Sequence, residues 1–259
     1  IIPTGDEQKL IGKHGDYILL SFGRDKAISG VSGGAVLTEH AVLAGKLHSM
    51  EESAEHLRYW DILNLIDYPI RYQFAKWIWP LKIAKLYLHC IRLLRFLPRI
   101  LSDEEKQGKQ DMQLTKLPNA CAALAYRQWH SLTAFNDHRQ TLTTFLKKTA
   151  RKREWDVPLG VEDSLPLQKF PMVHTEAESV RRQLKRDDIY LDDGWCGAVV
   201  NPRTVDQGAA GYKKGSCRNA EQIAQTILTL PTHPTMTGKQ AEHLVTRLQL
   251  RIDELLIDN

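Results

Sequence analysis

Ser21-Phe22-Gly23-Arg24-Asp25-Lys26 is the stretch of sequence that decides our prediction of the fold. The residues just before it, Asp16-Tyr17-Ile18-Leu19-Leu20, have the length and apolar character of a buried strand, which the glycine of the stretch then ends. After it, Gly33-Gly34 turns the chain into a second short apolar run, Ala35-Val36-Leu37-Thr38. The sequence therefore predicts a strand, a loop and a strand, with Lys26 held in the loop.

Lys26 and Ser21 are the candidate functional residues of this loop. A lysine amine can form a Schiff base with an aldehyde cofactor. Ser21 lies five residues earlier, where its hydroxyl and the backbone amides of nearby glycines can bind an anion such as a phosphate. The alternative is an ordinary solvated lysine, because most lysines are exposed. The loop is not a P-loop, since it lacks the two glycines that this motif places upstream of its lysine.

The phrases around this loop resemble those of a known family. Ile11-Gly12-Lys13-His14-Gly15-Asp16, the hexapeptide Ser21 to Lys26, and Gly33 to Thr38 together resemble the active-site lysine segment of the DegT/StrS family of pyridoxal-phosphate aminotransferases. That resemblance implies an α/β fold: the end of a type I (aspartate-aminotransferase-like) large domain, followed by a small C-terminal α/β domain. It also implies that Lys26 forms the Schiff base with pyridoxal phosphate and that Ser21 binds the cofactor phosphate.

Two later stretches resemble the same family. A helix that begins after Pro118 matches the family helix with an Ala-Ala-Leu core, at Ala122, Ala123, Leu124, Gln128 and, further on, Arg139. The stretch from Gly211 to Pro234 resembles the family's C-terminal phrase, in which a cysteine, an alanine and a glutamate lead into a helix and then a Leu-Pro-x-His-Pro turn. Thr237 can then cap the final helix.

One position departs from the family pattern. The usual motif begins with Asn-Tyr-Arg, and its asparagine reaches the cofactor phosphate of the neighbouring subunit. Counting back from Ala122 places Leu114, Thr115 and Lys116 at these three positions. Leucine cannot donate a hydrogen bond, so either Lys116 or another residue replaces that contact, or phosphate binding is weakened.

We divide the chain into three parts. Residues 1–48 are expected to be the closing strands of the large domain, 49–113 a helical segment with a basic amphipathic insertion, and 114–259 a dimer-contact helix with the small α/β domain. Apolar residues at three-residue steps predict a helix from Glu51 to Ile66. In the third part, Lys169 to Val173 predicts a strand and Glu176 to Arg186 a helix, an alternation typical of a sheet covered by helices.

Residues 68–101 contain no acidic residue. The spacing of Lys82, Lys85, His89, Arg92 and Arg99 predicts one face of a single helix, beside an apolar face and tryptophans. This pattern fits a helix that lies in a membrane interface, and no run is long enough to span one. The alternative is a helix packed on its own domain or on a dimer partner, with solvated lysines.

Composition and charge leave the broad class open but exclude several functions. The hydrophobic content of 42% is ordinary for a globular protein, and a net charge of +4 does not call for a nucleic acid partner. Four cysteines without a CxxC pair give little support to a zinc site or a disulfide framework, which favours a cytoplasmic setting. The chain has neither an initiator methionine nor a signal peptide and resembles the C-terminal portion of a family member.

The leading hypothesis from the sequence is an aminotransferase that uses pyridoxal phosphate to convert a keto-sugar nucleotide to an amino sugar, with an amino acid as donor, in surface-polysaccharide biosynthesis. The resemblance implies a homodimer and implies that the chain alone does not transaminate. One alternative is a degenerate or non-aminating relative such as a sugar dehydratase, although Lys26 stands where that branch has a histidine. Another is a peripheral membrane protein of polysaccharide assembly that docks through residues 68–101.

Overall fold

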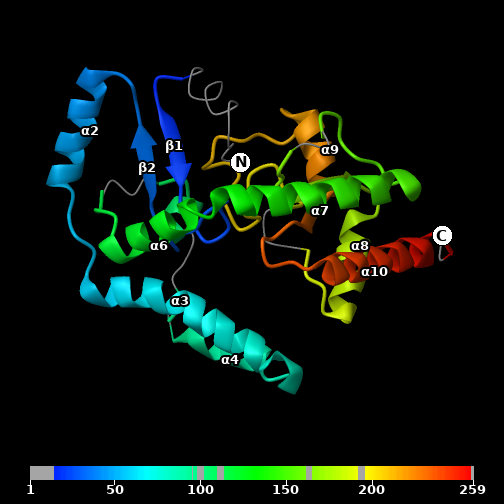
Figure 1. The fold of residues 1–259 in the computed structure, drawn as a ribbon. Helices are drawn as coiled ribbons and strands as arrows, with labels where there is room; N and C mark the ends of the chain where they lie inside the picture. The colour runs from blue at the N-terminus through cyan, green and yellow to red at the C-terminus, as the bar shows by residue number, and fades with distance from the viewer. Residues whose placement is uncertain are drawn as a thin grey trace. The chain divides into compact units, whose positions relative to one another are not determined.

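A computed structural model describes residues 15–94, 96–97, 102–109, 114–161, 165–191 and 196–257 of the chain (Figure 1). Backbone contacts divide the chain into two compact units. The N-terminal unit contains residues 2–102 and 111–133, and the C-terminal unit contains residues 103–110 and 134–259. The three domains predicted from the sequence, 1–48, 49–113 and 114–259, stay a prediction.

The N-terminal unit combines one small sheet with helices. Its elements are β1 (Ile18–Ser21), β2 (Gly34–Leu37), α2 (Ala41–Ser53), α3 (Tyr59–Trp77), the 3-10 helix η1 (Trp79–Leu81), α4 (Ala84–Leu93) and α6 (Asn119–Trp129). β1 and β2 pair antiparallel, with Ile18 opposite Leu37 and Ser21 opposite Gly34. The predicted order of strand, loop and strand is therefore present, and the loop between them carries Lys26.

The expectation that the first strand is buried is wrong. Leu19, in the middle of β1, is 78% exposed, and the other side chains of the strand are half-buried or exposed. The reason is that β1 and β2 form a sheet of two strands, and one face of it is left uncovered in the part of the chain that the structure describes. The preceding phrase, Ile11 to His14, lies outside the described residues.

The prediction of a single helix from Glu51 to Ile66 is wrong, because α2 ends at Ser53 and α3 begins at Tyr59. Residues 41–48, which were expected to belong to closing strands, are helical in α2. The chain is extended between α2 and α3 because the Glu55 backbone pairs with a distant segment. Its N–H donates to the carbonyl of Leu114 (3.2 Å) and its carbonyl accepts from the N–H of Lys116 (2.8 Å). The apolar periodicity continues through this break and could not reveal it.

The single basic helix expected in residues 68–101 is also wrong. η1 follows α3, and Lys82 then takes the left-handed conformation (φ 61°) before α4 begins. Lys85, His89 and Arg92 share α4 as predicted, whereas Arg95 and Arg99 lie outside the described residues. No helix among the described residues combines the length and apolar character needed to cross a membrane.

The C-terminal unit contains a second two-stranded sheet and most of the remaining helices. Its elements are α5 (Asp103–Lys106), nearly all of α7 (Leu132–Lys152), β3 (Lys169–Val173), α8 (Ala177–Leu184), η2 (Lys185–Asp187), α9 (Arg218–Thr226), β4 (Ile227–Pro231) and α10 (Gly238–Ile257). β3 matches the predicted strand, and α8 with η2 covers the predicted charged helix. β4 was not predicted as a strand.

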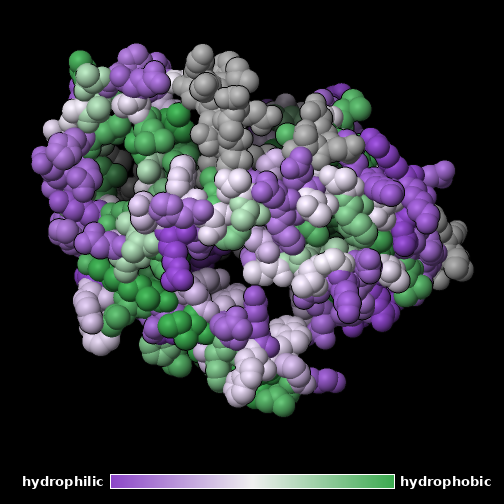
Figure 2. Space-filling model, viewed as in Figure 1, coloured by the Kyte–Doolittle hydropathy of each residue, from purple (hydrophilic) through white to green (hydrophobic). Residues whose placement is uncertain are grey.

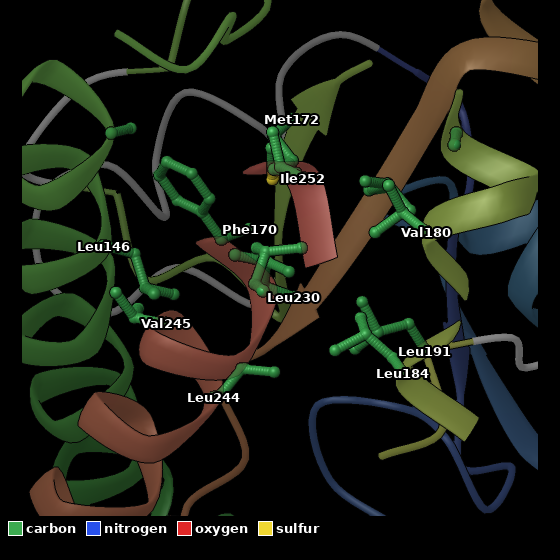
Figure 3. Packing of buried hydrophobic residues seen from close by; sticks show 14 residues of the cluster. Leu146, Phe170, Met172, Val180, Leu184, Leu191, Leu230, Leu244, Val245 and Ile252 are labelled. Carbon is green, nitrogen blue, oxygen red and sulfur yellow. The ribbon is translucent and has the colours of Figure 1, made fainter. Parts of the chain in front are cut away.

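The core of the chain lies in this unit (Figure 3). β3 and β4 are antiparallel, with Phe170 opposite Leu230 and Met172 opposite Leu228, and all four side chains are fully buried. Helices α7, α8 and α10 supply most of the rest of the cluster, which includes Leu146, Val180, Leu184, Leu244, Val245, Leu248 and Ile252. Alternation along each strand puts one face of the sheet into this core.

The final helix starts as the sequence predicts. Thr237 Oγ1 accepts from the N–H of Gln240 (3.3 Å), and Gln240 Oε1 accepts from the N–H of Thr237 (2.9 Å). This reciprocal pair is a capping box, which satisfies two backbone donors at the start of a helix. The predicted cap of α10 is confirmed.

Candidate active-site loop

The loop between β1 and β2 is closed by backbone hydrogen bonds. The Phe22 N–H donates to the carbonyl of Gly33, and the Gly30 N–H donates to the carbonyl of Phe22, both at 2.8 Å. Within the loop, the Lys26 N–H donates to the carbonyl of Gly23 (3.2 Å), which makes a tight turn. Lys26 therefore sits in a turn whose two ends are fixed by the strands.

Ser21 and Lys26 lie on the same side of Gly23. A Cβ atom placed on Gly23 would be 3.7 Å from Lys26 Cγ and 3.7 Å from Ser21 Oγ. The structure thus brings the two residues predicted from the sequence together, and the glycine between them leaves open a space that any other residue would begin to fill.

The Lys26 side chain is half-exposed to solvent. It is 44% exposed, and its Nζ lies 3.9 Å from Asp25 Oδ1, whose side chain is equally exposed. An ion pair at this distance and exposure contributes little to stability. The amine is therefore accessible to a bound molecule.

Gln128 of α6 fixes the part of the loop that follows the lysine. Its Oε1 accepts from the backbone N–H of Ser29, and its Nε2 donates to the carbonyl of Ser29, both at 2.9 Å. The amide side chain thus satisfies both backbone groups of one residue, as a neighbouring strand would. Sequence comparison with the family had matched Gln128 without a role. Its partner is 99 positions away, so no local pattern could have identified the contact.

Close packing on the start of α6 holds the same segment. Ile28 is buried. A Cβ on Gly30 would come within 2.6 Å of the carbonyl oxygen of Cys121, so any other residue would collide with backbone. Gly33 has φ +90°, and a Cβ there would overlap the side chain of Leu117. The glycines after Lys26 therefore allow the loop to lie directly against α6.

Arg24 joins the loop to α3. Its guanidinium carbon lies 4.3 Å from the centre of the Tyr68 ring, a cation–π contact. Burial raises the pKa of Tyr68, and the hydrogen bond and positive charge of Arg24 partly oppose that rise. The contact places Tyr68, the first residue of the basic segment 68–101, against Arg24, which stands two positions before Lys26. Neither residue was singled out from the sequence.

The position that departs from the family pattern lies in an exposed segment. Leu114 is exposed, and its backbone is used in the pairing with Glu55. Lys116, the residue that could replace the missing amide, is half-buried, and its backbone N–H is also used there. No described contact links either side chain to Ser21 or Lys26.

Two other residues matched to the family lie in the C-terminal unit. Arg139 on α7 is buried, and burial lowers its pKa. Glu221 at the start of α9 accepts from the hydroxyl of Tyr212 and from the N–H of Gly215 (2.6 Å). The Tyr212 bond and then the Gly215 N–H lower the pKa of Glu221, and the same carboxylate raises the pKa of Tyr212 to about 12. Glu221 thus anchors the turn before its own helix.

The family model for the DegT/DnrJ/EryC1/StrS aminotransferases matches residues 94–249, which is more than half of the chain. The match leaves out Ser21 and Lys26, so their roles stay a prediction. No curated protein matches the sequence.

Solved structures that include aminotransferases are similar to most of the chain. DesV of S. venezuelae, in complex with a ketimine intermediate, has a TM-score of 0.58 at 18% identity, covering 90% of this chain and 51% of its own. The putative sugar aminotransferase Spr1654 of Streptococcus pneumoniae, in its PMP form, has a TM-score of 0.60 at 10% identity, covering 94% and 54%. PseC of Helicobacter pylori, an aminotransferase of pseudaminic acid biosynthesis, has a TM-score of 0.57 at 12% identity, covering 93% and 54%.

These similarities confirm the predicted fold class: the chain has the α/β fold of these aminotransferases. The chain spans about half the length of the solved structures that it matches. Two of the similar structures contain pyridoxamine phosphate, Spr1654 and NtdA of Bacillus subtilis, so pyridoxal phosphate is the cofactor indicated for this group.

Proposed function

The chain belongs to the DegT/DnrJ/EryC1/StrS aminotransferase family, and from that membership we propose that it supplies the cofactor lysine of a pyridoxal-phosphate aminotransferase. The proposed substrate is a keto-sugar nucleotide, and the proposed donor is an amino acid. The observation that carries the proposal is the placement of Lys26 and Ser21 on one side of Gly23. The putative sugar aminotransferase Spr1654, one of the similar structures, supports the substrate class.

The residues of the loop fit pyridoxal phosphate in their chemistry. The cofactor has an aldehyde, which needs an amine, and a phosphate, which needs hydrogen-bond donors. Lys26 provides the amine and Ser21 the hydroxyl, and both lie beside Gly23, which has no side chain. Lys26 would hold the aldehyde end and Ser21 the phosphate end.

When bound, pyridoxal phosphate supplies the electron sink of transamination. The protein supplies position and proton transfer. With the cofactor bound, Lys26 Nζ would accept the proton that leaves the substrate carbon and hold it for return. Ser21 Oγ would donate a hydrogen bond to a phosphate oxygen. Gln128 keeps the segment after the lysine fixed, so that Nζ does not have to be reordered in each turnover.

We also propose that the enzyme is a homodimer with shared sites, as the family resemblance implies. In such a dimer, Leu114 would stand where a phosphate-binding asparagine is usual, and it offers no side-chain donor. The phosphate would then depend more heavily on Ser21 than it does in relatives that have the asparagine.

Borohydride trapping tests this proposal without an activity assay. The full-length protein, incubated with pyridoxal phosphate, reduced and digested, is expected to yield the cofactor mass on the peptide that contains Lys26. Lys26→Ala should lose the label, and the matched variant Lys46→Ala, at an exposed lysine of α2, should keep it. Ser21→Ala should bind the cofactor about tenfold more weakly, because one hydrogen bond to a charged group is lost.

Retention of the label in Lys26→Ala, or a label on another lysine of the wild-type protein, would contradict the assignment of Lys26. A label on Lys26 without amino transfer to any keto-sugar nucleotide would leave the cofactor site standing and exclude the proposed substrate class.

A further inference from the structure

We propose that α3, η1 and α4 form a hairpin that docks on an anionic membrane surface. We call residues 68–94 the basic hairpin. The proposal is independent of the proposed reaction, because it rests on the exposed side chains and charges of this segment and not on the cofactor loop.

The basic hairpin is closed by contacts between its own helices. Ala75 of α3, Ala84 and Ile91 of α4, and Ile78 between the helices are buried. The rings of Phe74 and Tyr87 meet edge to face with centres 5.1 Å apart. α3 and α4 lie side by side in Figure 1. The apolar residues on the outside of the hairpin are therefore not needed to hold it together.

The outside of the hairpin is strongly apolar. Trp77 at the end of α3 and Leu93 at the end of α4 are each 75% exposed. Other large apolar side chains exposed on the hairpin are Ile70, Tyr72, Phe74, Leu81, Ile83, Leu86 and Leu94. In Figure 2, hydrophobic residues lie among hydrophilic ones over α3 and α4. An exposed apolar surface of this extent marks a binding surface, because single scattered residues are the normal case.

The charges of the hairpin identify the kind of partner. From residue 68 to residue 94 there is no aspartate or glutamate, and Lys76, Lys82, Lys85 and Arg92 are exposed. Lys85 Nζ lies 5.5 Å from the centre of the Trp79 ring, so a cation lies next to an aromatic ring on this surface. Cations beside exposed tryptophan and leucine complement an anionic lipid surface, where the charge meets headgroups and the apolar groups enter the acyl boundary.

The placement of the charges also indicates which end of the hairpin would meet the membrane. The acidic residues of α3, Asp61 and Asp67, lie in its first half, whereas Lys76, Lys82 and Lys85 lie close to the turn in sequence. Trp77, Leu81 and Ile83 surround that turn, where η1 and the left-handed Lys82 reverse the chain. The turn would therefore enter the interface first, and the hairpin would lie on the membrane without crossing it, since neither helix can span a bilayer.

Vesicle flotation of the full-length protein tests the proposal. The protein should float with vesicles of phosphatidylcholine and phosphatidylglycerol, far less with phosphatidylcholine alone, and less as salt is added. Lys76→Gln/Lys82→Gln/Lys85→Gln should weaken binding on the order of 100-fold, about fivefold for each charge near the surface. Trp77→Ala should weaken it about tenfold, because a large apolar side chain no longer enters the interface.

A second triple variant controls for net charge. Lys148→Gln/Lys152→Gln/Lys239→Gln removes the same charge from exposed lysines of α7 and α10, and it should float like the wild type. Circular dichroism and melting of each variant separate lost binding from lost folding. Lipids brominated near the headgroup should quench the tryptophan fluorescence of the wild-type protein more than that of Trp77→Ala.

Three outcomes would overturn the proposal. Equal recovery in the soluble fraction with anionic and neutral vesicles would exclude an anionic membrane. Equal loss in the two triple variants would mean that only the net charge matters. A change of oligomeric state in Trp77→Ala, measured by light scattering, without any flotation of the wild type would show that the face is covered by protein.

Discussion

The two units of this chain differ in how far their apolar side chains are buried. In the C-terminal unit, two short strands and three helices bury Phe170, Met172, Leu228 and Leu230 completely. In the N-terminal unit, strands of similar length leave Leu19 and Val36 exposed, and α3 and α4 expose tryptophans and leucines. The described residues of one unit therefore form a large buried core, while those of the other leave many apolar side chains exposed.

In the N-terminal unit, a small number of specific contacts fixes the position of the candidate active-site loop. The loop with Lys26 is held by the Gln128 amide, by glycines that lie against α6, and by the stacking of Arg24 on Tyr68. Contacts of this kind fix one geometry without burying much area. We infer that the C-terminal unit carries most of the stability.

The largest effect is expected from a substitution in the core of the C-terminal unit. Phe170→Ala should lower the free energy of unfolding by about 3–5 kcal/mol, because it removes a fully buried ring and leaves a cavity. The matched change Leu19→Ala in β1 should cost no more than about 0.5 kcal/mol, since that side chain is largely exposed. Denaturant unfolding followed by circular dichroism measures both, and equal losses would refute the contrast between the units.

A smaller effect is expected when the two hydrogen bonds between Gln128 and Ser29 are removed. Gln128→Ala leaves the backbone N–H and carbonyl of Ser29 without their partner, at a cost of about 2 kcal/mol for two hydrogen bonds. Amide hydrogen exchange should speed up in the loop and stay unchanged in β3 and β4. Gln73→Ala, at an exposed residue of α3, serves as the control. Faster exchange throughout the chain would contradict a local role for Gln128.

The smallest effect concerns a charged cluster on the C-terminal unit. Glu178 accepts hydrogen bonds from Arg203 and Arg181, each at 2.9 Å, which lower its pKa from 4.5 to about 2. Because the folded pKa is lowered, this stabilisation is complete above pH 4.5 and is lost as the pH falls toward 2. The Glu178 side chain is 53% exposed, so screening reduces its value to about 1 kcal/mol.

Glu178→Gln should therefore flatten the dependence of stability on pH between about 4.5 and 2, when its unfolding curves are compared with those of the wild type. Asp187, whose pKa is lowered by Arg251, titrates in the same acidic range and contributes to both curves. Only the difference between the two proteins reports on Glu178. A difference that is independent of pH would mean that the carboxylate is not linked to folding.

The sequence predicts those elements whose signals are local. β3 was identified because its residues form a short run that follows a loop-like segment, and α10 because Thr237 can cap a helix whose apolar residues repeat at helical spacing. Elements set by distant contacts were not identified. The break between α2 and α3 depends on pairing with Leu114 and Lys116, and β4 follows α9 without any residue that ends a helix.

The candidate site divides in the same way. Ser21 and Lys26 were predicted because they stand five positions apart in a recognisable phrase, and the structure places both beside Gly23. Gln128 was quoted only as part of a matching helix, and Arg24 was not considered. Their partners, Ser29 and Tyr68, are far away in sequence, so only the folded chain shows that these residues support the loop.

The stacking of Arg24 on Tyr68 couples the lysine loop to the hairpin. Tyr68 stands nine residues before Trp77 on α3, a separation of about 14 Å along a helix. α3 therefore connects the loop that carries Lys26 with the exposed Trp77. With its turn on a bilayer, the protein would hold Lys26 at a set height above the lipid, and a tilt of the helix would reach the loop through the Arg24–Tyr68 contact and through the packing of α3 on α6.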